Sequence, residues 1–392
     1  MRHENSVFHQ VLQHLPRREF DRLVAVHGVD EESRRLTAHH HLMALLYAQL
    51  SNAPSLRAIA DGMSSHGARL YHLGGVAVPR STLADANRDR PAALFEDLFA
   101  ALLKQIRPGY RRKLAETVYL IDSTSLRLDS RSARWAEFSA HVCGGKAHII
   151  YDPDADQPIY AAVTPARVND ITAAQVMPVE RGATYVFDLG YYDYAWWARL
   201  HDAGCRIVTR LKSNTHLLIT QERGLPAGST LISDRVGLLP QRQAKNRQNP
   251  FRAKVREVLV RNEKGEILRI VTNDLDAPAQ EIADLYKRRW AIELFFRWIK
   301  QKLEITRFLG TSENAVRIQV SVALIAYLLL RLAQATQVTI RSPLTFARLV
   351  TLHLMERRRL SDLLTPQCKK PMPRARTSHQ LAFALCKPRA GH

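Results

Sequence analysis

Two short apolar runs, each followed by an aspartate, constrain the fold of this chain more than any other feature. Residues 118–121 precede Asp122, and residues 184–187 precede Asp188. Short apolar runs of this kind are typical of buried strands. Carboxylates at strand ends face the crevice where open α/β sheets bind ligands. One such aspartate is most often a turn or N-cap residue, but two of them indicate a shared site.

The pattern around these two runs predicts an α/β fold. The same kind of apolar run predicts further strands at 147–151, 159–163, 206–211, 255–260 and 267–271. A helix is expected near 195–203, and the resulting strand–helix–strand unit favours a mixed sheet with helices on its faces. We therefore expect a core over residues 113–305, with a polar, β-rich insertion at about 213–275.

The two ends of the chain are predicted to be helical. Residues 1–112 form a helical N-terminal domain, and residues 306–392 form a helical region with a basic tail, which is either a phosphate-binding arm or disordered. Segments 55–62 and 81–88 predict two short helices, the second with Ser81 as N-cap.

These two short helices carry Arg57, Arg88 and Arg90 and suggest a helix-turn-helix that reads DNA. The stretch between them, about eighteen residues, is too long for the tight turn of that motif. A plain helical bundle with a solvated basic face is the alternative. The triplet from His39 to His41 is not expected to bind metal, because adjacent helical residues point in different directions.

The charge of the chain favours a polyanionic partner. It has 57 Lys and Arg against 37 Asp and Glu, which gives a net charge of +20. Each cation that meets a phosphate releases a condensed counterion, so nucleic acid is preferred over a membrane surface or an acidic protein. A basic run with no acid in it is either a solvated loop or a DNA-backbone contact; its members are Arg242, Lys245, Arg247, Arg252, Lys254 and Arg256.

The remaining composition predicts a soluble, cytoplasmic protein with no membrane partner. The four cysteines are scattered without a CxxC pair, which argues against a zinc site and against a disulfide framework. Residues 1–23 are mixed and charged, unlike a signal peptide. The most apolar run, 320–330, is about eleven residues long, too short for a bilayer, and predicts a buried helix.

A basic helix over residues 278–303 supplies a third acid. Tyr286, Arg289, Glu293 and Lys300 fall within an arc of roughly 60° at about 100° per residue. This quartet borders a separate apolar stripe, as a helix lining a cleft requires. The alternative is a surface helix with an ordinary Arg289–Glu293 pair.

The quartet resembles the Y-R-E-K signature of bacterial insertion-sequence DDE transposases of the insertion sequence 4 type. The resemblance extends to Leu120-Ile-Asp-Ser-Thr around the first aspartate and to Phe187-Asp-Leu-Gly-Tyr around the second. Val208-Thr-Arg-Leu-Lys and Phe308-Leu-Gly-Thr-Ser-Glu-Asn are similar to later segments of that family. Gln49-Leu-Ser and Ser81-Thr-Leu-Ala-Asp-Ala-Asn resemble its helical leader domain, so the similarity covers nearly the whole chain.

The resemblance implies an RNase H-like core in which Asp122, Asp188 and Glu293 bind two Mg²⁺ ions, with Mn²⁺ as a substitute. It implies cleavage of double-stranded DNA at the terminal inverted repeats of an element and transfer to target DNA, with water and 3′-hydroxyl groups as nucleophiles. A dimer on DNA in the bacterial cytoplasm is expected, because two ends have to be brought together.

The same resemblance implies DNA contacts by the basic and aromatic residues of the signature. Tyr286 and Arg289 would contact a phosphate near the cleavage point, and Lys300 the nearby backbone; Arg210 and Lys212 are also expected to contact DNA.

Five neighbours of the site have two interpretations each. Ser123 and Thr124 either orient the site or cap a turn, and His148 either assists the site or is a core histidine. Trp290 and Trp298 either stack on an unpaired base or, as we favour, pack in the core.

Two rival functions are compatible with these sequence features. One is a catalytically silent DNA-binding repressor or domesticated relative, which would tend to lose the metal carboxylates. The other is a nuclease of the same fold that cuts without joining. The presence of all three carboxylates and of the whole signature favours an active transposase.

Overall fold

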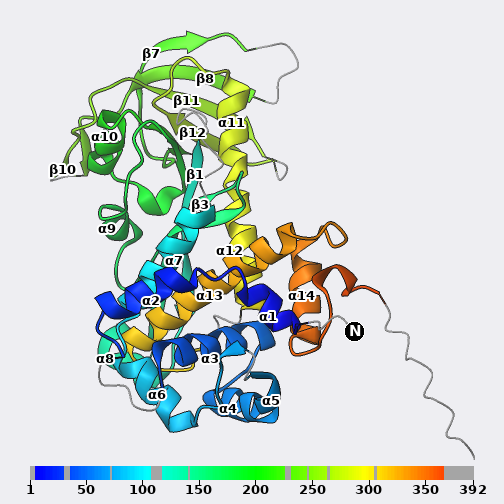
Figure 1. Ribbon diagram of the computed structural model, residues 1–392. Coiled ribbons are helices and arrows are strands. Elements are labelled where there is room, and N and C mark those ends of the chain that lie inside the picture. Colours follow the sequence, from blue (N-terminus) through cyan, green and yellow to red (C-terminus); the bar gives the residue numbers. More distant parts are fainter. Residues whose placement is uncertain are drawn as a thin grey trace, which may run out of the picture.

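The computed structural model of the chain describes residues 5–30, 36–70, 73–106, 117–139, 142–225, 231–244, 247–262, 265–303 and 307–365. Figure 1 shows two lobes, a helical lobe built from both ends of the chain and a sheet lobe built from its middle. Helices α11 (Ala279–Arg288) and α12 (Trp290–Lys302) lead from the sheet lobe to the helical lobe.

The helical lobe has α13 at its centre. It contains α1 (Val7–Leu12), α2 (Arg17–Val26), α3 (Ala38–Ser51), α4 (Leu56–Ser65), α5 (Gly67–Leu70), α6 (Arg80–Asp89), α7 (Ala92–Ile106), α13 (Glu313–Ala335) and α14 (Pro343–His353). Helix α13 packs against α1, α3, α6, α7 and α14, so helices from the two ends of the chain share one core. Helical structure was predicted for both ends, and their packing into one lobe was not.

Helix α13 contains the apolar run 320–330 and is longer than that run. By length and composition alone this helix of 23 residues is apolar enough to cross a membrane, but 83% of its most apolar window is buried inside the protein. The prediction of a buried helix is confirmed, and within the described residues α13 is the core helix of the lobe.

The sheet lobe is built on a ten-stranded mixed sheet. Its first strands are β1 (Val118–Arg127), β2 (Glu137–Ser139), β3 (Val142–Asp152), β4 (Gln157–Pro165), β5 (Thr184–Phe187) and β6 (Arg206–Arg210). Strand β1 pairs in parallel with β5, and β5 with β6, whereas β3 is antiparallel to both β1 and β4. This arrangement confirms the predicted mixed-sheet, RNase H-like core.

Both faces of the sheet are covered, as alternation along β1 shows. Leu120 belongs to the core that contains the apolar side chains of α11, α12 and α13. Its neighbour Ile121 belongs to a second core, with Trp196 and Trp197 of α10 (Tyr194–Asp202). Successive strand residues point to opposite faces, which explains why apolar residues continue along β1 without a break.

The region predicted as a β-rich insertion extends this sheet. It forms β7 (Leu218–Arg223), β8 (Leu231–Leu238), β11 (Val255–Arg261) and β12 (Ile267–Thr272), and a small hairpin of β9 (Arg242–Ala244) and β10 (Arg247–Gln248). Strand β12 pairs antiparallel with β6 and aligns Ile270 with Arg210, which joins the insertion to the core sheet.

The helix predicted from Pro278 to Leu303 is interrupted at Arg289. At the junction the backbone N–H groups of Arg289 and Ile292 donate to carbonyls three residues earlier. Such bonds tighten the helix locally, as in a 3₁₀ turn. The prediction of one uninterrupted helix is therefore wrong, although α11 and α12 continue in the same general direction (Figure 1).

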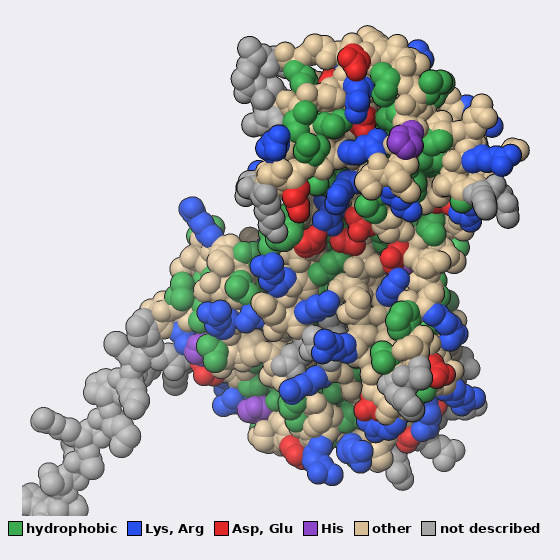
Figure 2. All heavy atoms as spheres, turned by 180° about the vertical axis from the view of Figure 1, so that it is seen from behind, with side chains coloured by type: hydrophobic (Ala, Val, Ile, Leu, Met, Phe, Trp, Pro, Cys, Tyr) green, Lys and Arg blue, Asp and Glu red, His purple; other side chains and the backbone are tan. Residues whose placement is uncertain are grey.

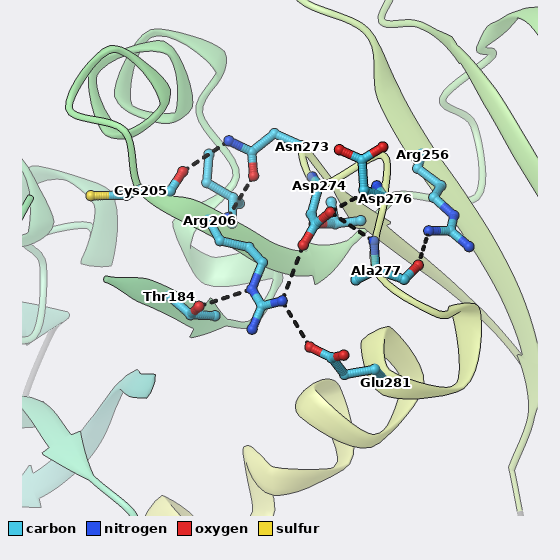
Figure 3. A network of polar contacts seen from close by, with 11 residues as sticks. Thr184, Cys205, Arg206, Arg256, Asn273, Asp274, Asp276, Ala277 and Glu281 are labelled. Atoms are coloured by element: carbon cyan, nitrogen blue, oxygen red, sulfur yellow. Dashed lines mark hydrogen bonds and ion pairs between the residues drawn. The ribbon is translucent and has the colours of Figure 1, made fainter. Parts of the chain in front are cut away.

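Arg206 of β6 fixes the first turn of α11, as Figure 3 shows. Its guanidinium donates to Thr184 Oγ1 at 2.9 Å, to Asp274 Oδ2 at 3.0 Å and to Glu281 Oε1 at 2.8 Å. Thr184 and Arg206 begin their parallel strands, so α11 starts at this end of the sheet. From there it leads towards the end where Asp188 follows β5.

Two details of the predicted helix-turn-helix are wrong. Ser55 does cap α4, but α6 begins directly after Pro79, so Ser81 lies inside the helix. Arg90 is 7% exposed and donates to the Thr37 carbonyl, which excludes it from reading DNA. A buried guanidinium is retained only where backbone or acidic acceptors surround it.

The basic run from Arg242 to Arg256 has both buried and exposed members. Arg256 is 3% exposed and makes two hydrogen bonds to Asp234 of β8, so a DNA contact by this residue is excluded. Arg242, Arg247, Arg252 and Lys254 are exposed, and Lys245 lies outside the described residues. The DNA-backbone contact of the exposed members stays a prediction.

We predict that Arg206→Met destabilises the protein by about 1–3 kcal/mol, because it leaves the partly buried Asp274 without its cation. Thermal unfolding followed by circular dichroism measures the loss. Arg88→Met is the matched control, because Arg88 is 62% exposed and, among the residues that the structure describes, its side chain pairs with exposed acids of its own helix alone. Equal stability of Arg206→Met and wild type would contradict this anchoring role.

Candidate active site

Asp122 and Asp188 lie side by side on parallel strands. Ile121 of β1 is aligned with Phe187 of β5, and each aspartate is the next residue along its strand. Asp188 follows the end of β5, as predicted. The prediction that β1 ends at Asp122 is wrong, because β3 continues to pair with β1 as far as Arg127.

Backbone N–H groups fix one oxygen of each aspartate. Asp122 Oδ1 accepts a hydrogen bond of 2.8 Å from the N–H of Ser123. Asp188 Oδ1 accepts one of 2.8 Å from the N–H of Gly190, in the short 3₁₀ helix η5 (Leu189–Tyr191). These bonds leave the second oxygen of each carboxylate free to face the other elements of the site.

Arg289 connects Asp122 to Glu293. Its guanidinium lies 3.3 Å from Asp122 Oδ2 and 2.5 Å from Glu293 Oε1, at the junction between α11 and α12. The same group lies 5.9 Å from the centre of the Tyr286 ring. Tyr286 is only 9% exposed, so its ring supports Arg289 from inside the protein. The alternative interpretation placed an Arg289–Glu293 pair on a surface helix. That pair is present, and its Arg289 also contacts Asp122 of the sheet.

The carboxylates repel one another in a poorly solvated place. Burial, and then the charge of Asp188, raise the pKa of Asp122 to about 6, although Arg289 and the Ser123 N–H lower it. Glu293 adds a smaller upward effect on the same pKa. Figure 2 shows acidic side chains gathered at the waist between the two lobes, with Lys and Arg around them.

The family of the chain follows from comparison with known proteins. Residues 113–329, which contain both aspartates and the whole Tyr286–Lys300 segment, match the family described as transposase DDE domain. The chain belongs to the DDE transposase family. A putative transposase of Sinorhizobium fredii is 39% identical over 309 residues, which cover 77% of this chain and 85% of that protein.

Further relatives are more distant. A probable insertion sequence element transposase of Geobacillus stearothermophilus is 30% identical, with 78% of each chain covered. Residues 3–75 match a domain of unknown function. A solved structure, the piggyBac transposase synaptic complex with hairpin DNA, aligns over 93% of this chain and 83% of that chain at 11% identity and a TM-score of 0.48. The predicted family is thus confirmed, and the insertion sequence 4 subgroup stays a prediction.

The basic residues predicted to contact DNA surround this site at different depths. Arg210 is the last residue of β6 and is half-buried. Burial raises the pKa of Tyr286, and the positive charge of Arg210 partly offsets this rise. Lys212 is exposed, with its ammonium 4.6 Å from the centre of the Tyr192 ring. Lys300 is half-buried, and burial, followed by the charge of Arg127, lowers its pKa. Their roles in this transposase stay predictions.

The two tryptophans of α12 differ. Trp298 is half-buried, and its ring centre lies 4.8 Å from that of Tyr327 on α13, so core packing is observed there. Trp290 is 52% exposed beside Arg289. Only Trp290 is therefore accessible to a base.

The donor set of the site fits a hard divalent cation. Carboxylate oxygens are the ligands that Mg²⁺ prefers. Burial, and then the negative charges of Asp188 and Glu293, raise the pKa of Asp122, and a cation bound there would offset those charges. No group of three or more His, Cys, Asp or Glu side chains among the described residues converges closely enough to hold a metal ion. Glu293 is paired with Arg289 in this arrangement.

A fourth carboxylate, which the sequence analysis missed, lies beside the site. Asp170 opens α9 (Asp170–Ala174) and accepts a hydrogen bond of 2.8 Å from Ser123 Oγ. His148 is fully buried between Thr164 Oγ1, at 2.8 Å, and Asp170, at 3.7 Å. The sequence signal at Asp170, an acid in the first turn of a short helix, is common and carried no functional weight.

We predict that Asp122→Asn stabilises the protein in metal-free buffer at pH 7.5 by about 1–3 kcal/mol, or a few degrees in Tm. The folded-state pKa of Asp122, about 6, lies above the ordinary pKa of 3.8 that the side chain has in the unfolded chain. Its favourable contribution is therefore complete below pH 3.8 and lost as the pH rises through 6. The stabilisation should disappear near pH 4.

Differential scanning fluorimetry at both pH values measures this effect, with the exposed Asp61→Asn on α4 as control. A variant less stable than wild type at pH 7.5 would show that Arg289 outweighs the repulsion among the carboxylates.

Proposed function

We propose that this protein cuts the ends of a DNA element and joins them to target DNA, using divalent cations held by Asp122, Asp188 and Glu293. Family membership supports the transposase activity in general. The observation that carries the specific assignment is the meeting of Asp122, Asp188 and Arg289–Glu293 from three separate elements. When bound, the cations activate the attacking hydroxyl or water and stabilise the leaving oxygen.

The chain's own residues prepare this chemistry. Asp122 and Asp188 are held by the sheet and by backbone N–H groups, so their positions are fixed before DNA arrives. Arg289 occupies the space between Asp122 and Glu293 and offsets their charge. A guanidinium binds phosphate in a bidentate manner. We infer that a DNA phosphate draws Arg289 away and frees Glu293 for the cations.

DNA is the partner that the surface favours. The net charge of +20 is combined with exposed cations on both sides of the acidic waist (Figure 2). Mg²⁺, or Mn²⁺ in its place, would neutralise the acids that otherwise repel the backbone. We further propose that a dimer on DNA holds two terminal inverted repeats at once.

The two rival functions differ from this proposal in observable ways. A silent DNA-binding protein would keep the basic surface but has no need of two half-buried carboxylates on adjacent strands. An RNase H-like nuclease would share the metal chemistry and would produce cut but never joined DNA.

We predict that Glu293→Gln abolishes cleavage and strand transfer, at least 100-fold below wild type, while DNA binding persists, because a metal-binding charge is lost at nearly constant shape. Labelled element-end DNA is incubated with target DNA and Mg²⁺, Mn²⁺ or EDTA. Joined products that need metal and are absent with Glu293→Gln support the proposal. Cut products that are never joined favour the nuclease, and binding without cutting under any metal favours the silent protein.

We also predict that Arg289→Ala weakens binding to element ends by about tenfold, because one charged phosphate contact is lost. Electrophoretic mobility shift measures the affinity, and thermal unfolding shows that the fold survives. Arg22→Ala is the control, since Arg22 is exposed on α2 and pairs only with Glu19 of the same helix among the described residues. Unchanged end binding by Arg289→Ala would contradict a phosphate contact.

A further inference from the structure

Asp170 has one oxygen committed to the protein. Its Oδ1 accepts from Ser123 Oγ at 2.8 Å and from Lys146 Nζ at 3.2 Å, and His148 Nδ1 lies 3.7 Å away. Lys146 also donates to the carbonyl of Val168, which fixes the ammonium. These contacts hold the Asp170 side chain in place. The side chain is 22% exposed, so solvent still reaches it.

The other oxygen of Asp170 faces the second aspartate of the proposed metal centre. A Cβ atom added to Gly190 would lie 3.0 Å from Asp188 Oδ1 and 3.2 Å from Asp170 Oδ2. Both carboxylates therefore lie close to Gly190. Asp170 Oδ2 takes no hydrogen bond from any residue that the structure describes.

Buried polar atoms without partners point into the same place. Tyr191 is 1% exposed, and its hydroxyl makes no hydrogen bond to a described residue. Burial, and then the charges of Asp170, Asp122 and Asp188, raise the pKa of that hydroxyl, although the nearby Ser123 side chain lowers it, so the hydroxyl lies among these carboxylates as a neutral group. His148 is 0% exposed, and its Nδ1 also has no hydrogen-bond partner there.

An unsatisfied buried hydroxyl costs free energy unless water or a ligand reaches it. A hydrated divalent cation offers such partners, since Mg²⁺ keeps several of its waters and those waters donate hydrogen bonds. Carboxylates and hydroxyls just outside the ligands orient a metal site and raise its affinity.

We propose that Asp170, with the Tyr191 hydroxyl beside it, accepts hydrogen bonds from the water ligands of the cation held by Asp188. This inference rests on the proposed metal centre and deepens it. Asp170 is a positioning residue, because it acts through water and through Ser123, which also donates its N–H to Asp122. Lys146 holds Oδ1 of Asp170, so Oδ2 is the oxygen that would accept from the waters.

Asp170→Asn separates this role from a structural one. The amide oxygen can still accept from Ser123 and Lys146, so the contacts that hold α9 survive. The amide nitrogen then takes the place of Oδ2 and presents a donor, where the water ligands need an acceptor. A structural role predicts an almost neutral change, whereas the positioning role predicts weaker metal binding.

The test is the binding of Mn²⁺ alone to the full, DNA-free chain, followed by the electron paramagnetic resonance signal of free Mn²⁺. We expect Asp170→Asn to weaken the affinity about tenfold or more, and Tyr191→Phe by a few fold, with unchanged circular dichroism. Tyr191→Phe keeps the ring and loses only an unpartnered hydroxyl, so it decides the question if Asp170→Asn does not fold. Asp61→Asn is the matched control.

Asp188→Asn distinguishes a failure of this inference from a failure of the proposed metal centre. If it abolishes binding while Asp170→Asn and Tyr191→Phe bind Mn²⁺ as wild type does, the inference is wrong and the proposed metal centre stands. If wild type binds no Mn²⁺, or if Asp188→Asn binds it equally well, both are wrong.

Discussion

The interaction on which the site depends is the placement of one guanidinium between two carboxylates from distant segments. Arg289 holds Glu293 of α12 against Asp122 of β1, and without a cation there the acids would repel one another in a half-buried place. Arg289 makes this contact at the junction between α11 and α12. Arg206 fixes the other end of α11, so the helix is tied to the sheet at both ends. In our proposal, a DNA phosphate competes for Arg289 and frees Glu293 for the cations.

Much of the core could be predicted because its signals are local. The apolar runs at 184–187 and 206–211 correspond closely to β5 (Thr184–Phe187) and β6 (Arg206–Arg210). Strands buried on both faces read as continuous apolar runs, and turn residues mark their ends. The spacing of Tyr286, Arg289, Glu293 and Lys300, with the segments around the two aspartates, indicated the family. In the structure Arg289 contacts Tyr286, Glu293 and Asp122.

What could not be predicted depends on contacts between distant segments. The extension of β1 beyond Asp122 is set by pairing with β3, and the burial of Arg256 is set by Asp234 on β8. Arg90 looked like a DNA-reading residue, because nothing near it in sequence shows that it donates to the Thr37 carbonyl. Asp170 went unnoticed for the same reason, since its place beside Ser123 arises only when the sheet has formed.

The central claim is that Asp122, Asp188 and Glu293 converge on the same divalent cations. Anomalous diffraction from crystals of the protein bound to DNA and soaked in Mn²⁺ tests this most directly. The account predicts anomalous density between Asp122 and Asp188, with Glu293 turned from Arg289 towards it and Arg289 on a DNA phosphate. Density elsewhere, or an intact Arg289–Glu293 pair beside DNA and an empty aspartate pair, would contradict it.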